Sequence, residues 1–194
     1  MILIKHRSKK HMLTEDKKRE IESIVDGIIG DNGLKAPGFD LTKFLTKEYD
    51  FKIGAQSLER NTTGILLIND DAYIPETDTH RLISVNRNLG TDDEYVYNLK
   101  KRFIIAHEFA HFILHKSDHT QYAHRDTDKK NTSEEQEADY FARCLLMPRQ
   151  LVCDLLNMDG IKEQNLCDKA SVISRLFFVT LTKAKMRIDE LGLA

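Results

Sequence analysis

The stretch that decides the fold occupies residues 102–115 and reads R-F-I-I-A-H-E-F-A-H-F-I-L-H. Two of its histidines, His107 and His111, are four residues apart, and Glu108 follows the first of them directly. On an α-helix, residues four apart lie one above the other on the same face, so both imidazoles can reach one Zn²⁺ ion. Glu108 projects from nearly the same side and could accept a proton from a zinc-bound water. The spacing therefore predicts a zinc site with His107 and His111 as ligands and Glu108 as general base.

The residues around this motif favour a buried helix over a surface helix with two solvated histidines. They are apolar on nearly every face: Phe103, Ile104, Ile105, Ala106, Phe109, Ala110, Phe112, Ile113 and Leu114. Two histidines and a glutamate in such surroundings need a partner, because an unpaired buried polar group costs several kcal/mol. A metal ion would supply that partner.

A catalytic zinc site needs a third protein ligand, and the sequence excludes one common source of it. In metzincins the motif continues with a glycine three residues and a histidine six residues after the second histidine. This chain has Leu114 and Ser117 at those positions. The alternative is a glutamate from a second helix, which leaves the fourth metal position open for water.

A second helix is marked at residues 133–148, which read S-E-E-Q-E-A-D-Y-F-A-R-C-L-L-M-P. Ser133 is its predicted N-cap and forms a capping box with Gln136. The acidic residues of the first turn suit the helix dipole, and Pro148 ends the run. The sequence thus predicts a helix whose first turn carries several carboxylates.

Three glutamates of this helix are candidates for the third ligand: Glu134, Glu135 and Glu137. The apolar residues define a buried stripe of Ala138, Phe141, Ala142 and Leu145. Glu134 and Glu135 lie along that stripe, whereas Glu137 is rotated toward its edge. Asp139 is four residues from Glu135, so one carboxylate can bind the metal while the other hydrogen-bonds a ligand histidine. We predict Glu135 as ligand and Asp139 as that partner, with a merely solvated acidic turn as the alternative.

Together the two motifs resemble those of the ImmA/IrrE family of zinc metallopeptidases, which cleave repressor-type transcription factors of mobile elements and stress regulons. The resemblance runs from about residue 64 to residue 148 and is weaker through residue 191. It implies His107, His111 and Glu135 as zinc ligands and Glu108 as general base, in agreement with the choice made from the spacing. Asp139 stands where many relatives have asparagine, which keeps the hydrogen-bonding capacity and adds charge.

Length and composition fit one globular unit. The chain has 194 residues, 41% of them hydrophobic, and we divide it into a metallopeptidase core at 12–150 and a helical C-terminal extension at 151–194. The 29 basic and 31 acidic residues nearly balance, so no global footprint for nucleic acid is present. We expect no signal peptide and no membrane-spanning segment. Three cysteines without C-x-x-C spacing indicate reduced thiols in a cytoplasmic protein, with Cys144 in the core.

The remaining patterns predict an α+β fold with a small antiparallel sheet, and the family resemblance implies a zincin-like arrangement with that sheet beside the zinc helix. Helices are expected from Thr14 to Gly30 and at residues 40–47, and strands at residues 51–58, 64–69 and 81–87. Residues 116–132 are expected to form a polar loop that borders the cleft. One of the strands at 64–69 and 81–87 should be the sheet edge that holds an extended substrate, although both could instead be purely structural.

The C-terminal residues 168–191 read as two short helices around Val179 and Thr180. Their expected apolar faces are Ala170, Ile173, Leu176 and Phe177, then Leu181, Ala184, Ile188 and Leu191. Their spacing resembles a helix-turn-helix, with Lys183, Lys185 and Arg187 on the second helix. Asp189 and Glu190 offset these charges, so a helical cap on the core is favoured over DNA binding.

The sequence therefore favours a zinc-dependent endopeptidase that cleaves a regulator. The most direct test is to incubate the protein with the repressor encoded beside its gene. The main alternative is a metal-stabilised binding protein that sequesters a regulator without cutting it, and a DNA-binding regulator ranks third. An intact Glu108 and only three evident ligands argue against the binding-only alternative, because structural zinc sites are usually closed by four. We expect His115 to hydrogen-bond a buried backbone group or carboxylate. The residue that stabilises the oxyanion is left open among His80, His119, Tyr122, His124 and Tyr140.

Overall fold

The computed structural model describes residues 13–75, 77–115 and 132–194, and the backbone of residues 121–124. The helices are α1 (Glu15–Asn32), α2 (Leu41–Tyr49), α3 (Glu94–Leu114), α4 (Ser133–Leu146), α5 (Arg149–Leu156), α6 (Leu166–Phe177) and α7 (Leu181–Glu190). The strands are β1 (Phe51–Gln56), β2 (Gly64–Ile68), β3 (Arg81–Asn86) and β4 (Gln121–His124). The α+β class predicted from the sequence is confirmed. None of the described helices is long and apolar enough to cross a lipid bilayer.

The sheet is mixed rather than antiparallel, with the strand order β1-β3-β2-β4. The expected antiparallel pairing holds for β2 with β3 and for β2 with β4, whereas β1 runs parallel to β3. Among the described strands, β1 and β4 are therefore the edges. The prediction that residues 64–69 or 81–87 form an edge is wrong, because each of these strands has a neighbour on both sides. The predicted loop at 116–132 likewise contains β4, which supplies one of those neighbours.

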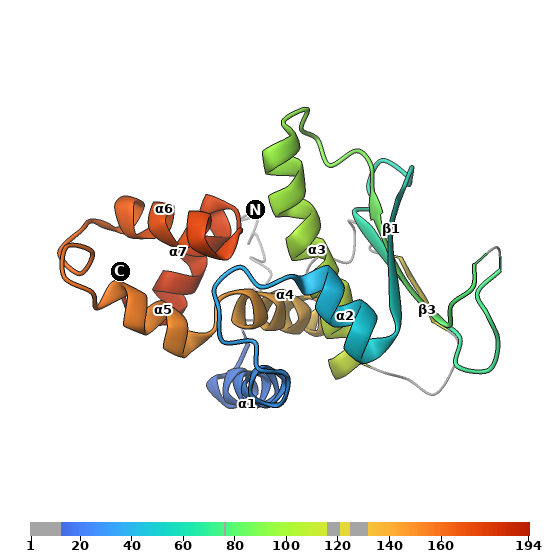
Figure 1. Ribbon diagram of the computed structural model, residues 1–194, viewed down its shortest axis with the longest axis horizontal. Coiled ribbons are helices and arrows are strands. Elements are labelled where there is room, and N and C mark those ends of the chain that lie inside the picture. The colour runs from blue at the N-terminus through green and yellow to red at the C-terminus, as the bar shows by residue number, and fades with distance from the viewer. Residues whose placement is uncertain (1–12, 76, 116–120, 125–131) are drawn as a thin grey trace, which may run out of the picture.

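Helix α3 is the centre of the molecule, with the sheet on one side and α5, α6 and α7 on the other (Figure 1). Its N-cap is Asp93, whose side chain accepts a hydrogen bond from the backbone N–H of Val96 at 2.9 Å. Phe109, from the middle of the HExxH motif, is fully buried and packs edge-on against Phe51 of β1 and Phe141 of α4. This packing fixes the rotation of α3, because Phe109 can face the core only if the histidines face elsewhere.

The positions of the helix ends agree better with capping residues than with the end of the apolar pattern. Thr14 caps α1 as predicted, but the helix continues beyond Gly30 and ends at Gly33, whose φ of 64° is left-handed. Asp40 caps α2, accepting from the N–H of Lys43 at 2.9 Å. Helix α5 begins directly after Pro148, within the predicted helical extension, but it was not predicted as a separate helix.

The C-terminal helices share their apolar interior with the rest of the protein. Ala170, Ile173, Phe177, Val179, Ala184 and Ile188 belong to the same buried cluster as Phe109 and Phe141. Two residues expected on the apolar faces, Leu176 and Leu181, are instead 43% exposed. This continuous core runs across residue 150. The predicted division of the chain at that residue stays a prediction.

A buried ionic network also joins the C-terminal helices to α1 and α4. Arg187 of α7 is 1% exposed and donates to the carbonyl of Met147 at 3.1 Å and to Glu22 of α1 at 3.2 Å. The same carboxylate accepts from Tyr140 at 2.8 Å and from Arg149 at 2.9 Å. Burial alone would raise the pKa of Glu22, but these hydrogen bonds and the charge of Arg187 hold it below its ordinary value. Arg187 is therefore a structural residue, and it is removed from the basic surface that a DNA reader would need.

Candidate active site

The two motifs meet where α3 and α4 pack against each other. His107 is fully buried, and its Nε2 lies 3.1 Å from Nε2 of His111. Glu135 of α4 faces both rings, with one carboxylate oxygen 3.3 Å from Nε2 of His107 and the other 3.2 Å from Nε2 of His111. These three residues each offer a ligand atom, and the atoms lie within 4.8 Å of one another. They form a group that could hold a metal ion.

The three glutamates considered as the third ligand point in different directions from the start of α4. The N-cap is Thr132 rather than Ser133, and its hydroxyl accepts from the N–H of Glu135 at 3.3 Å. The predicted capping box of Ser133 with Gln136 is therefore wrong by one residue. Glu134 is exposed, while Glu135 turns inward to the imidazoles. Burial would raise the pKa of Glu135, but its hydrogen bonds with His107 and His111 hold that pKa well below the ordinary value.

Asp139 lies one turn after Glu135 and contacts the far side of His107. Its Oδ1 is 3.0 Å from Nδ1 of His107, so the ring presents Nε2 toward Glu135. Its other oxygen, Oδ2, lies 3.4 Å from the ammonium of Lys183, which comes from α7. The predicted pairing of Asp139 with a histidine of the first motif is present in the structure. The link to α7 was not visible in the sequence, because no local pattern connects residues so far apart.

His115 plays the corresponding part for His111. The Nδ1 atoms of the two rings are 3.1 Å apart, and Nε2 of His115 lies 3.2 Å from a carboxylate oxygen of Glu137. The expectation that His115 hydrogen-bonds a carboxylate is confirmed. Glu137 is anchored in turn by the hydroxyl of Ser133, which donates to it at 2.9 Å. Burial would raise the pKa of Glu137, but these bonds keep it below its ordinary value.

Glu108 occupies the wall between α3 and the start of β2. Its side chain is 2% exposed and packs against Gly64, the first residue of β2. A β-carbon at position 64 would lie 2.8 Å from Oε1 of Glu108 and 2.6 Å from Cγ2 of Ile104. The absence of a side chain at Gly64 therefore makes the room in which the carboxylate stands.

Two of the candidates for the oxyanion-stabilising residue, Tyr140 and His80, make other contacts in the structure. Tyr140 donates to Glu22 on the side of α4 that faces α1, and its pKa is raised chiefly by burial. His80 holds the loop before β3, with Nδ1 2.9 Å from the carbonyl of Asn69 and the ring against Tyr73. His119 and the side chains of Tyr122 and His124 lie outside the described residues.

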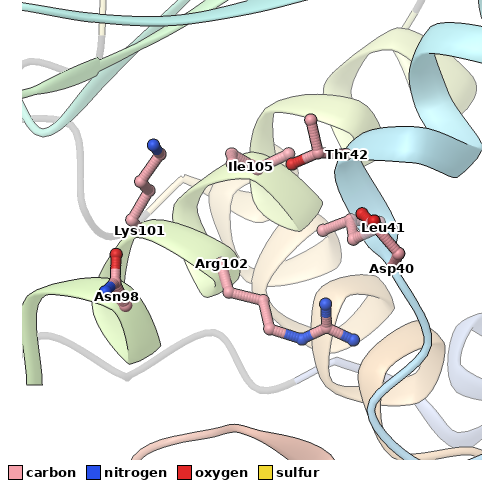
Figure 2. A pocket seen from close by; sticks show the side chains of 7 residues that line it. All are labelled: Asp40, Leu41, Thr42, Asn98, Lys101, Arg102 and Ile105. Carbon is pink, nitrogen blue, oxygen red and sulfur yellow. The ribbon is translucent and has the colours of Figure 1, made fainter. Parts of the chain in front are cut away.

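Two hollows flank α3 near its N-terminal half. The larger has a volume of about 520 Å³ and lies between α3, the start of α7, and Thr63 and Leu89 from the segments before β2 and α3. The smaller, of about 190 Å³, lies between α3 and α2 (Figure 2). There Arg102 reaches toward the start of α2, with its guanidinium 5.1 Å from the ring centre of Phe39, while Lys101 points the other way. Burial lowers the pKa of Arg102 to about 10, and the charge of Asp40 partly opposes this shift.

An α+β fold in which an HExxH helix presents two histidines to a glutamate of a second helix is the arrangement of a metallopeptidase. Comparison with protein families places this chain more narrowly. The family model described as the IrrE N-terminal-like domain, Peptidase_M78, matches residues 73–188. Because the match covers more than half of the chain, the protein belongs to this metallopeptidase family, which confirms the resemblance seen in the motifs. No curated protein matches the chain closely enough to be named as a relative.

Proposed function

We propose that the protein is a zinc-dependent endopeptidase that cleaves a repressor-type transcriptional regulator. The observation that carries this proposal is the convergence of His107, His111 and Glu135 on one point, with Glu108 buried beside them. Membership of a metallopeptidase family supports the class of reaction. The fold contributes a rigid frame, because both motif helices are anchored in the core.

The donor set suits zinc in chemistry and in spacing. Two imidazole nitrogens and a carboxylate oxygen are the ligands of a catalytic His₂Glu zinc site. A tetrahedron with metal–donor bonds of about 2.0–2.1 Å has edges of about 3.3 Å. The two Nε2 atoms are 3.1 Å apart, and they lie 3.2 and 3.3 Å from different oxygens of the Glu135 carboxylate. One ligand atom from each residue lies within 4.8 Å of the others, which supports a single ion that contacts all three residues.

In the proposed mechanism each residue has a defined task. A bound Zn²⁺ would lower the pKa of a coordinated water and polarise the scissile carbonyl. Glu108 accepts the proton of the attacking water and then delivers it to the nitrogen of the leaving amine. Asp139 and His115 hold the Nδ1 sides of His107 and His111, which keeps both Nε2 atoms directed at Glu135.

The metal assignment predicts a clear pattern of zinc content. His107→Ala, His111→Ala and Glu135→Ala should each purify with much less zinc than the unchanged protein, because each variant loses one of only three protein ligands. Zinc content is measured by atomic emission on the purified proteins. Glu134→Ala is the matched control, since Glu134 neighbours Glu135 but is exposed and outside the ligand group. Full zinc in Glu135→Ala with loss in Glu134→Ala or Glu137→Ala would show that the register of the second motif is wrong.

The proposed substrate is a regulator in the cytoplasm rather than bulk protein. The family resemblance supports this choice, as do three cysteines that are all free thiols. We propose that the substrate joins the sheet at β4, the edge strand next to β2, whose first residue contacts Glu108. Such a substrate must be extended where it is cut, which limits cleavage in a folded repressor to accessible segments.

Cleavage of the repressor encoded beside the gene should therefore be limited and metal-dependent. We expect one or a few cut bonds, fragments that appear only with zinc, and no fragments after chelation. Gel electrophoresis and mass spectrometry of the fragments provide the measurement. Digestion of casein at many bonds would identify a general protease and contradict the regulatory proposal. Tight binding of the repressor without any cut would favour the sequestering protein instead.

A further inference from the structure

The larger hollow beside α3 has a partly apolar lining. Leu89, Val96, Phe103 and Ile104 supply its apolar side chains, of which Leu89 and Val96 are only half-buried. At about 520 Å³ it falls within the range of roughly 300–1,000 Å³ that is usual for ligand pockets. Apolar surface left open inside a cavity gains free energy when an apolar group covers it.

The apolar lining of this pocket adjoins the candidate active site along α3. Ile104 lies one helical turn before Glu108, and both side chains contact Gly64, since a β-carbon there would meet each of them within 3 Å. Phe103 lies one turn before His107. The pocket and the candidate general base thus share one wall, so a group in the pocket would lie next to the bond that is attacked.

The opposite wall comes from α7 and is connected to the metal centre. Lys183 lies over the ring of Phe103, with Nζ 3.8 Å from the ring centre, and the same Nζ is 3.4 Å from Asp139. Asp139 in turn binds His107. Thr180 and Thr182, from the start of α7, line the pocket on this side. The C-terminal helices therefore contribute directly to the surroundings of the site, beyond packing against the core.

The charged ends of the two lysines in the pocket wall are already engaged. Lys100 donates to the carbonyl of Leu89 at 2.9 Å, and Lys183 contacts Asp139 and the Phe103 ring. Both lysines line the hollow, where the aliphatic stem of a long charged side chain can cover apolar surface. A basic substrate group would be repelled here, and an acidic one would have to compete with these contacts. An apolar group meets neither obstacle.

We propose that this pocket, between α3 and the start of α7, binds a large apolar side chain of the substrate next to the cleaved bond, and that the first turn of α7 sets its size limit. The inference rests on the proposed function, because it names the substrate class of that same site. It makes α7 a determinant of specificity. It also predicts that the cut bonds are flanked by residues such as leucine, methionine or phenylalanine on one side.

Filling the pocket tests the proposal. Thr182 is exposed on the pocket wall, so Thr182→Phe should fold normally and occupy the space with its ring. Digestion of a randomised synthetic peptide library, read by mass spectrometry, should show one position enriched in large apolar residues for the unchanged protein. Thr182→Phe should reduce kcat/KM for those peptides by about 10-fold or more and shift the preference to alanine or serine. Thr46→Phe, on the exposed face of α2, is the matched control and should keep the original profile.

A second measurement needs no catalysis and so separates this proposal from the proposed function. N-acetyl-leucine amide, titrated into the intact protein, should shift the amide NMR signals of Val96, Phe103 and Thr182. N-acetyl-glycine amide should not do so, and the shifts should vanish in Thr182→Phe but persist in Thr46→Phe. If no peptide is cut but these shifts appear, the endopeptidase assignment fails and the pocket stands. An unchanged cleavage profile in folded Thr182→Phe, or equal shifts with both amides, would overturn the pocket.

Discussion

Replacing Glu108 by glutamine is expected to leave zinc content and fold unchanged while peptide hydrolysis falls by about 10²–10⁴-fold. The amide has nearly the same size as the carboxylate, so it fits the space beside Gly64. It cannot accept the proton of the attacking water, which is the task proposed for Glu108. The side chain is absent from the group of potential ligands, so the metal should stay bound.

The measurement compares initial rates on the repressor and on a peptide that contains its cleaved bond. Zinc content and circular dichroism are recorded for the same preparations. Glu134→Gln is the matched control, because it makes the same chemical change on an exposed glutamate of α4 and should keep full activity. Equal rates for Glu108→Gln and the unchanged protein would remove the proposed mechanism.

Replacing Arg187 by methionine should lower the free energy of unfolding by about 3 kcal/mol, at the low end of what the loss of one partner from a buried ion pair costs. Methionine fills most of the volume but cannot donate to the Met147 carbonyl or to Glu22. Glu22 keeps its bonds from Tyr140 and Arg149, which limits the loss. Urea unfolding at a fixed zinc concentration gives the measurement, since ligands of the native state add their own stability.

The exposed Arg175 of α6 supplies the control, and Arg175→Met should change stability by less than about 0.5 kcal/mol. The effect of Arg187→Met should also depend on pH. The pKa of Glu22 is lowered in the fold, so its stabilising contribution is present above the ordinary value of 4.5 and disappears as the pH falls through the folded value. The difference between variant and unchanged protein should therefore shrink in acid. A loss below about 1 kcal/mol at neutral pH would mean that the network does not hold α7 in place.

The candidate site could be predicted from the sequence because it depends on the spacing of residues within single helices. His107 and His111 share a helix face by their spacing alone, and Glu135 with Asp139 repeats that spacing on the next helix. The structure brings these residues together and adds His115 with Glu137 as a second supporting pair. Glu135 faces both histidines even though the predicted N-cap was off by one residue, and its role as a metal ligand stays a prediction.

The sheet could not be predicted to the same degree because strand order depends on contacts between distant segments. Strands were predicted at residues 51–58, 64–69 and 81–87 and are found there with slightly shorter bounds, but nothing local shows that β3 lies between β1 and β2. Strand β4 was missed because Gln121–His124 is short and lacks apolar alternation. Its pairing with β2 moved the edge of the sheet and with it the proposed position of the substrate.

The C-terminal helices illustrate how one buried charge can mislead. Arginine is a residue type typical of surfaces and DNA-binding sites, yet Arg187 is 1% exposed and paired with a carboxylate from α1. Leu176 and Leu181 show the opposite error, since they fit an apolar stripe but are exposed. Helical periodicity gives the face of a helix, whereas the identity of its neighbour decides which face is covered.

The contact between Gly64 and Glu108 limits which substitutions at position 64 can be tolerated during evolution. Any side chain at position 64 would have to displace the carboxylate or Ile104, so a descendant that still depends on Glu108 should retain glycine there. A lineage that has abandoned catalysis, and keeps only binding, would be released from this limit. The two positions should therefore change together during evolution. Glycine at the start of β2 would then mark, in a newly sequenced genome, which distant homologues are still working enzymes.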